Sequence, residues 1–189
     1  MRSNLFPAVL TVTLLVLSGS TSLTASGVEG LAPVAAQPKK PGRVPHAMLT
    51  LKWYGQACFL LESPRGTRVL MDPIPDSIGY TLPAPIPVNF VTISHEHFDH
   101  TNVALATGTF TVLRGLTADK ADWQAHDRKF GDIHVRNVGV YHDDQQGKAR
   151  GLDSVFVFET GGLKIVHLGD LGHLLTGEQL ARIGRVDVV

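Results

Sequence analysis

The sequence has one cysteine, no excess of charge of either sign and no uninterrupted apolar run that could cross a membrane. The single cysteine, Cys58, excludes a disulfide framework within the chain. Lys and Arg together number 17, as do Asp and Glu, so the charge predicts no nucleic-acid partner. The apolar stretch at residues 5–17 is shorter than the roughly 20 residues that a bilayer requires. These absences favour an ordinary globular domain.

Residues 1–26 have the features of a secretory signal peptide. Arg2 supplies a positive start, residues 5–17 are mostly apolar, and small and polar residues follow in residues 18–27. This order is typical of exported proteins. We therefore expect cleavage of this segment, a secreted or periplasmic mature protein and no stable insertion in a membrane. An uncleaved membrane tether is the alternative.

Residues 27–47 are rich in Ala, Pro, Gly and Lys and show no periodic apolar pattern. Such a composition predicts a flexible linker. Residues 48–189 then form the expected single domain. The chain is 43% hydrophobic, which is enough to bury a core.

The domain alternates between strand patterns and turn signals. Residues 63–66 and 160–162 predict hairpin turns, and repeated prolines predict a loop over residues 74–87. We expect strands at residues 49–54, 57–62, 67–71, 88–94, 109–113, 133–141, 154–159, 163–168 and 185–189. The expected helices are residues 118–130, capped by Thr117, and a short helix that begins after Thr176. This mixture predicts an α/β domain made mostly of sheet.

Four potential metal ligands lie close together at the end of an apolar strand pattern. They are His95, His97, Asp99 and His100. Imidazole binds zinc, iron and copper, and a carboxylate adds an oxygen ligand. In an extended segment His95 and His97 face the same side, and after a turn Asp99 and His100 can face a neighbouring position. The spacing suits two adjacent metal ions better than one; a surface loop that binds nothing is the alternative.

This cluster resembles the His-x-His-x-Asp-His signature of the metallo-β-lactamase superfamily. The other segments in the family's order are Trp53-Tyr54-Gly55, Cys58-Phe59-Leu60, Val69-Leu70-Met71-Asp72-Pro73, Tyr141-His142-Asp143 with Gly147, Arg150 and Gly151, and His167-Leu168-Gly169-Asp170. Within the superfamily the chain is most similar to the lactonase-like and largely uncharacterised metal-dependent hydrolases. The resemblance covers about residues 48–189 and implies an α/β fold, the αββα sandwich, with its C-terminal part incomplete.

The resemblance also implies a role for each ligand. The implied ligands of the first metal ion are His95, His97 and His142, and those of the second are Asp99 and His100. Asp170 would bridge the two ions. Asp99 would also be the catalytic residue that orients the attacking hydroxide or takes up its proton. Two Zn²⁺ ions are expected in the complete protein, with Mn²⁺ or Fe²⁺ as alternatives.

Two features depart from the family's pattern. Relatives supply one further histidine to the second metal ion from a segment beyond the position of Asp170. This sequence ends at residues 187–189 on an apolar strand pattern, before such a segment. We therefore expect a truncated domain whose second site lacks a ligand. Gln56 stands where many relatives have histidine, at a position that is not a metal ligand in the usual scheme.

Several residues near these motifs allow two interpretations. Asp72 either supports the metal loops from behind or ends a strand. His167 is expected to pack in the interior, whereas His173 either leans into the site as a weak substitute ligand or faces solvent. Arg150 either shapes a turn or meets an anionic substrate. Cys58 lies between apolar residues and is expected to be a buried structural thiol.

The ligand set, without any redox motif, favours hydrolysis of an ester, lactone, amide or phosphoester in a small-molecule substrate by a metal-bound hydroxide. An iron-dependent oxidoreductase on the same fold and a non-catalytic metal-binding module are the alternatives. Cleavage of β-lactams does not follow from the family name, because loops such as residues 74–87 decide the substrate.

Overall fold

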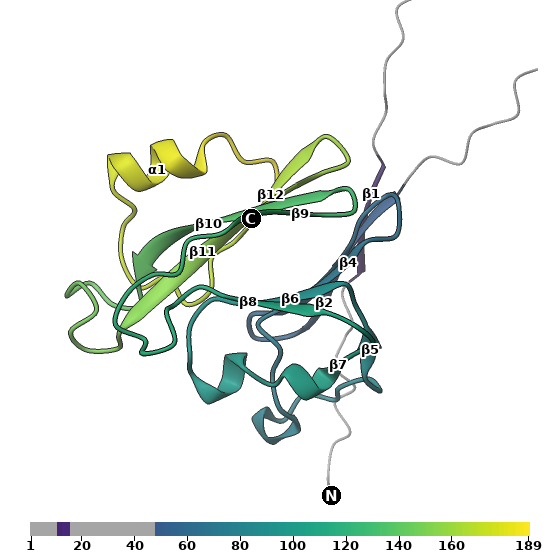
Figure 1. The fold of residues 1–189 in the computed structure, drawn as a ribbon, viewed down its shortest axis with the longest axis horizontal. Helices are drawn as coiled ribbons and strands as arrows, with labels where there is room; N and C mark the ends of the chain where they lie inside the picture. Colours follow the sequence, from purple (N-terminus) through teal and green to yellow (C-terminus); the bar gives the residue numbers. More distant parts are fainter. Residues whose placement is uncertain (1–10, 16–47) are drawn as a thin grey trace, which may run out of the picture.

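Two β-sheets lie face to face and form most of the structure (Figure 1). The computed structural model describes residues 48–189 and the backbone of residues 11–15. The expected linker, residues 27–47, lies outside the described residues. So does the expected signal peptide, apart from strand β1 (Thr11–Leu15), which pairs antiparallel with strand β2 (Met48–Gly55).

The first sheet has the strand order β1-β2-β3-β4-β6-β8. The remaining strands of this sheet are β3 (Cys58–Glu62), β4 (Arg68–Met71), β6 (Phe90–Ile93) and β8 (Thr111–Arg114). Strands β2, β3 and β4 are antiparallel neighbours, whereas β4, β6 and β8 run parallel. Parallel neighbours need crossover connections. Here the crossovers contain three short 3-10 helices, η1 (Asp76–Ile78), η2 (Phe98–His100) and η3 (Val103–Leu105).

The second sheet is antiparallel throughout, in the order β12-β11-β10-β9. Its strands are β9 (Asp127–Phe130), β10 (Ile133–Tyr141), β11 (Leu152–Thr160) and β12 (Leu163–His167). A separate small ladder joins β5 (Ile86–Pro87) to β7 (Ala106–Thr107). Helix α1 (Gly177–Ile183) begins after Thr176, as predicted. Among the described residues, no helix has the length and apolar content to cross a membrane.

Side chains that alternate along the strands build three apolar layers. On β11, Phe156 and Phe158 face the first sheet and belong to the core between the sheets. Val155 and Val157 point the other way and pack beneath α1, together with Ile183. A third cluster covers the outer face of the first sheet, on the side of the 3-10 helices. The expected α/β sandwich is thereby confirmed.

The helix expected at residues 118–130 is wrong. The chain instead forms a tight loop in which Thr117 N donates to Asp122 O (2.9 Å) and Lys120 N donates to Thr117 O (2.8 Å). Lys120 adopts a left-handed conformation (φ 61°), which interrupts a helix. The Thr117 hydroxyl also donates to Asp119 Oδ1 (2.6 Å). Such local side-chain bonds compete with helix formation, and β9 occupies the end of the segment, residues 127–130.

The strand expected at residues 185–189 is reduced to one parallel bridge between Ile165 and Val188. Val166 N donates to Val188 O (2.9 Å), and Val188 N donates to Lys164 O (3.2 Å). The segment therefore lies along the free edge of β12, with less regular pairing than the apolar pattern predicted.

Cys58 lies in β3 with none of its surface exposed. Burial raises the pKa of its thiol to about 12. Because the thiolate is the nucleophilic form, the expectation of a buried structural thiol is confirmed.

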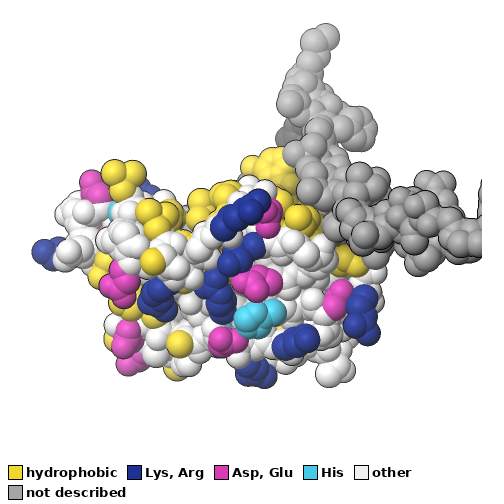
Figure 2. Space-filling model, turned by 90° about the horizontal axis from the view of Figure 1, so that it is seen from above, with side chains coloured by type: hydrophobic (Ala, Val, Ile, Leu, Met, Phe, Trp, Pro, Cys, Tyr) yellow, Lys and Arg dark blue, Asp and Glu magenta, His cyan; other side chains and the backbone are white. Residues whose placement is uncertain are grey.

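Charged side chains of both signs are interspersed on the face shown in Figure 2. Opposite charges also pair on the second sheet, where Glu159 lies 3.2 Å from Lys164 Nζ and 3.9 Å from Arg136 Nη2. Interspersed charges of opposite sign largely cancel at a distance. This face therefore does not present the one-signed surface that attracts nucleic acid.

Asp132 joins turns of the two sheets. Its Oδ1 accepts hydrogen bonds from Ser63 Oγ (2.5 Å) and Thr67 Oγ1 (2.7 Å), and its Oδ2 accepts one from Arg65 N (3.2 Å). Partial burial raises the pKa of Asp132, but the bonds from Ser63 and Thr67 hold it below its ordinary value. The carboxylate is therefore the form that ties the β3–β4 turn to the β9–β10 turn.

We expect Asp132→Asn to lower the free energy of unfolding by about 1 to 2 kcal/mol near neutral pH, because its hydrogen bonds lose a charged acceptor. The folded-state pKa is depressed, so this stabilisation is present above the unfolded pKa of about 4 and is lost as the pH falls through the folded pKa. Urea denaturation of both proteins at neutral and at acid pH measures the difference. A difference that does not shrink in acid would contradict this role.

Candidate metal centre

The turn after β6 carries the predicted histidine cluster. All four residues of β6 are buried, so the strand holds the start of the turn rigidly. Helix η2 then bends the chain and ends at His100. His95 and His100 are buried with ring centroids 4.2 Å apart, and His95 Nε2 lies 3.0 Å from Nδ1 of the exposed His97. The strand end and the 3-10 turn thus bring three imidazoles together.

Two strands of the second sheet bring further ligands to the same place. His142 follows β10, and Asp170 lies shortly after β12. One nitrogen from each of His95, His97 and His142 lies within 4.8 Å of the other two. Asp170 Oδ2 lies 3.3 Å from His142 Nε2 and 3.5 Å from His100 Nε2. Asp170 therefore lies between the three-histidine group and His100, where a bridging ligand is expected.

Asp99 lies at the edge of this group. Its Oδ2 is 4.0 Å from His100 Nε2 and accepts a hydrogen bond from Gln56 Nε2 (3.4 Å). Gln56 belongs to the tight turn between β2 and β3 and has a φ of 42°. The structure thus brings together all six residues that the sequence predicted as ligands. That they bind a metal ion stays a prediction.

Asp72, at the end of β4, supports the histidines from behind. It is completely buried, and its Oδ1 accepts a hydrogen bond from Ser94 N (2.7 Å). Its Oδ2 accepts hydrogen bonds from Ser94 Oγ (2.5 Å) and from His100 Nδ1 (3.0 Å). Ser94 Oγ in turn lies 2.9 Å from His95 Nδ1. Of the two interpretations of Asp72, the structure therefore supports the first.

This network fixes which ring nitrogen each histidine offers to the site. Because Asp72 occupies Nδ1 of His100 and Ser94 occupies Nδ1 of His95, both Nε2 atoms face the neighbouring ligands. Asp72, His95 and His100 are close enough to suggest a metal site of their own. Their oxygens and nitrogens, however, already bond to protein groups, so we interpret them as a support for the ligands.

The electrostatics of the site favour ionised carboxylates. Contact with His100, against the effect of burial, lowers the pKa of Asp170 to about 2. Burial lowers the pKa of His100, but Asp170 and Asp72 on its two sides outweigh it and raise the pKa to about 10. Burial and the neighbouring imidazoles lower the pKa of His97. In the metal-free protein the carboxylates are therefore anionic, His97 is neutral and His100 carries a proton. Because a histidine ligand must be neutral, metal binding at His100 would release that proton.

His167 and His173 have other roles. His167 Nε2 donates to Ala57 O (2.7 Å), and the residue is buried as expected. His173 Nδ1 donates to Leu174 O (2.8 Å), so its Nε2 accepts from Tyr141 N (3.1 Å). Both nitrogens of His173 are thus engaged away from the ligands. The suggestion that it substitutes for a missing ligand is wrong.

The loop after His142 is organised by Asp143. Its carboxylate accepts hydrogen bonds from the backbone nitrogens of Gln145, Gly147, Ala149 and Arg150, at 2.7 to 3.0 Å. Burial raises the pKa of Asp143, but these backbone bonds hold it below its ordinary value. The exposed Arg150 side chain lies at the rim of a hollow of about 440 Å³ that His142 and Asp170 also line. Arg150 therefore takes part in the turn and also borders the site.

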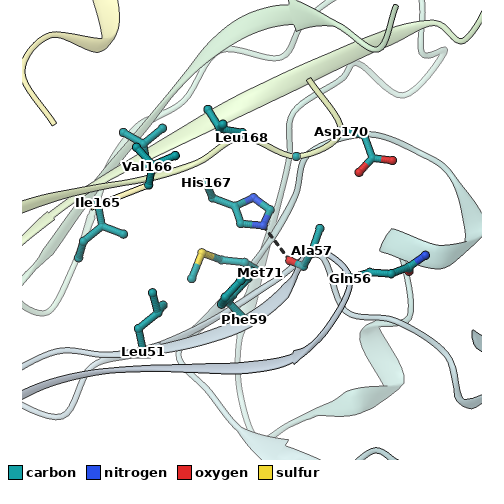
Figure 3. A pocket seen from close by; sticks show the side chains of 12 residues that line it. Leu51, Gln56, Ala57, Phe59, Met71, Ile165, Val166, His167, Leu168 and Asp170 are labelled. Carbon is teal, nitrogen blue, oxygen red and sulfur yellow. Dashed lines mark hydrogen bonds between the residues drawn. The ribbon is translucent and has the colours of Figure 1, made fainter. Parts of the chain in front are cut away.

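A second cavity, of about 430 Å³, lies between the sheets beside the site (Figure 3). Its walls are mostly apolar, and Leu51 and Ile165 lie toward one end. Gln56 and Asp170 lie at the other end, where the cavity meets the candidate ligands. The site is thus flanked by a polar hollow and by an apolar cavity.

Sequence reasoning missed two acidic residues near the ligands. Asp153, near the start of β11, is fully buried with Oδ1 3.4 Å from His95 Nδ1. Glu96 lies between two ligands in the sequence, and its Oε1 and Oε2 accept hydrogen bonds from Arg114 Nη1 at 2.8 and 2.6 Å. The available signal for Asp153 was an acidic residue in an otherwise apolar strand. Glu96 gave no signal, because its partner lies on another strand.

Comparison with known proteins shows the family of the chain. The model of the beta-lactamase superfamily domain matches residues 50–189. A UPF0173 metal-dependent hydrolase from Anaeromyxobacter sp. (strain K) is 30% identical, and the match covers 82% of this chain and 66% of the relative. A UPF0173 protein from Pyrococcus furiosus is also 30% identical, with 75% and 68% covered. The chain therefore spans about two thirds of the length of these relatives.

Solved structures show the same fold. A protein of Thermotoga maritima, assigned to the Zn-dependent hydrolases of the metallo-beta-lactamase superfamily, is 31% identical with a TM-score of 0.55. The match covers 74% of this chain and 59% of that protein. A protein of Parabacteroides distasonis matches with a TM-score of 0.51 at 16% identity, over 66% of this chain and 61% of that one. The second likeness concerns the fold alone.

We expect the purified protein to bind Zn²⁺ stoichiometrically, and His142→Ala to weaken binding by more than about 100-fold, since loss of a supporting partner alone costs about 10- to 100-fold. Isothermal titration calorimetry with a competing chelator measures the affinity. The control is His134→Ala, because His134 pairs with Asp127 on the second sheet at 2.6 Å and contacts none of the ligands. Equal loss in both variants, or a wild-type protein that binds no Zn²⁺, would contradict the site.

Proposed function

Because the chain belongs to the beta-lactamase superfamily domain family, we propose that the protein is a metal-dependent hydrolase of a small-molecule substrate. The observation that carries the proposal is the convergence of His95, His97, His142 and Asp170 from three strand ends. Several similar proteins are named metal-dependent hydrolases, which supports the proposal.

The donor set fits a divalent transition metal ion. Imidazole nitrogens together with carboxylate oxygens are preferred ligands of Zn²⁺, and Mn²⁺ and Fe²⁺ accept the same set. We assign His95, His97 and His142 to one ion, Asp99 and His100 to a second, and Asp170 to both. Bound divalent cations lower the pKa of water toward neutrality and polarise a carbonyl or phosphoryl oxygen.

Asp99 is the residue of this chain that we assign to proton transfer. Its hydrogen-bond partner from outside the 95–100 turn is Gln56, which holds one carboxylate oxygen at 3.4 Å. Among the described residues, no hydrogen bond to the other oxygen is found, so one oxygen can accept the proton of the attacking water and return it to the leaving group. Gln56 thereby positions Asp99. Proton transfer by Asp99 suits hydrolysis of an ester, lactone, amide or phosphoester, because the leaving oxygen or nitrogen needs a proton.

The surroundings of the site support a small-molecule substrate. The polar hollow and the apolar cavity, of about 440 and 430 Å³, have the volumes of ordinary ligand sites. They approach Asp170 from two sides, so a substrate held there can place a polar and an apolar part in different surroundings. Arg150, at the rim of the hollow, is available to an anionic group.

We expect the metal-loaded full-length protein to hydrolyse at least one member of a panel of lactones, esters, amides and phosphodiesters, and a chelator to abolish the activity. Asp99→Asn should lower kcat about 10²- to 10⁴-fold at saturating metal, the usual contribution of a general acid or base. The control is Asp127→Asn, a surface carboxylate of β9 with 77% of its side chain exposed.

Two results would overturn this proposal. A metal-loaded protein that hydrolyses no member of the panel would do so. Iron in the purified protein together with oxygen uptake would assign it to redox chemistry instead. Metal content by elemental analysis and the activity panel, measured on one preparation, separate these outcomes.

We also propose export, from the signal-like order of charge, apolar run and small residues in residues 1–26. Mass spectrometry of the protein from the extracellular or periplasmic fraction should then give an amino terminus near residue 27, or after residue 36. A mature protein that retains residues 11–15, the segment that pairs with β2, would contradict cleavage.

A further inference from the structure

Asp153 presents a buried carboxylate whose hydrogen bonding is incomplete. Its Oδ1 accepts a hydrogen bond from Ser154 N (2.7 Å) and lies 3.4 Å from His95 Nδ1. Its Oδ2 is buried and has no hydrogen-bond partner among the described residues. A buried carboxylate with so few donors is costly for a metal-free protein, so its presence calls for a physical reason.

The backbone of Gly169 packs closely against the carboxylate of Asp153. A Cβ atom on Gly169 would lie 2.6 and 2.7 Å from the two carboxylate oxygens and 2.7 Å from Ser94 Cβ. Trp123 Nε1 donates to the carbonyl oxygens of Asp153 (2.9 Å) and Val140 (3.0 Å), which holds the backbone. The carboxylate is therefore enclosed between the turn that carries His95 and the turn that carries Asp170.

Asp153 lies where it can stabilise a proton on Nδ1 of His95. If Nε2 of His95 binds a metal ion, Nδ1 carries the proton and donates it. Ser94 Oγ, at 2.9 Å, donates its own proton to Asp72 and can accept this one. Asp153 Oδ1, at 3.4 Å, adds a full negative charge beside the same N–H. Asp72 reaches His95 only through Ser94, so Asp153 is the carboxylate nearest to this ring.

We propose that Asp153 is a positioning residue for the metal centre. It holds His95 in the tautomer that presents Nε2, and its charge is balanced when a cation binds on the far side of the ring. The buried charge of Asp153 therefore destabilises the metal-free protein, and a bound cation offsets this destabilisation. This inference rests on the proposed metal site and not on any particular reaction.

The test is Asp153→Asn, which keeps the size of the side chain and removes the charge. We expect Zn²⁺ affinity, measured by calorimetry with a competing chelator, to fall about 10- to 100-fold. We expect the metal-free variant to unfold at the same temperature as the wild type or higher, because a buried charge with few partners is removed. A merely structural role would lower both quantities together.

Asp132→Asn is the matched control, since Asp132 is an aspartate at the opposite end of the second sheet whose side-chain hydrogen bonds all go to the turn of residues 63–67. It should lower stability and leave Zn²⁺ affinity unchanged, the reverse of Asp153→Asn. Wild-type affinity in Asp153→Asn overturns the positioning role alone. Failure of the wild type to bind Zn²⁺ overturns the metal site and this inference together.

A second measurement needs no variant. Nitrogen-15 NMR of the histidine rings in the metal-free wild type should show the proton of His95 on Nδ1, next to Asp153 and Ser94. A His95 ring protonated on Nε2 alone would overturn the proposal, even if Asp153→Asn failed to fold.

Discussion

The candidate site depends on one buried charge, the carboxylate of Asp72. Burying a carboxylate is costly unless it is hydrogen-bonded or paired, and Asp72 avoids this cost through the backbone and hydroxyl of Ser94 and the ring of His100. Asp72 N also donates to Thr92 O (2.9 Å), which continues the pairing of β4 with β6. The bonds that join two strands of the sheet therefore also orient the histidines that follow β6.

The packing of the two sheets sets the positions of the ligands. His95, His97, Asp99 and His100 follow a strand of the first sheet, whereas His142 and Asp170 follow strands of the second. The distance of 3.5 Å from Asp170 Oδ2 to His100 Nε2 thus spans the interface between the sheets. Because the core between them is continuous and buried, the sheets cannot shift without separating the ligands. A change that loosens the core between the sheets would therefore also disturb the candidate metal centre.

Most strands and the ligand cluster could be predicted from the sequence, because alternating apolar residues and the His-x-His-x-Asp-His spacing are local signals. The helix expected at residues 118–130 failed for a local reason too, since Thr117 and Asp119 form side-chain bonds that no apolar periodicity reveals. The sequence left two interpretations of Asp72 open, and the role of Asp153 could not be predicted. Each depends on which residues the strand register places opposite it, and register is a property of the folded sheets.

The residues behind the ligands are held more tightly than the residues in front of them. Behind the ligands, Asp72, Ser94 and Asp153 are fully buried, and their positions are fixed by hydrogen bonds or close packing. In front, Phe98 is 70% exposed and Arg150 lies on an exposed loop. Residues in front can change without disturbing the orientation of the imidazoles, whereas a change behind alters it directly. A fold built in this way can keep one metal centre while its rim adapts to different substrates.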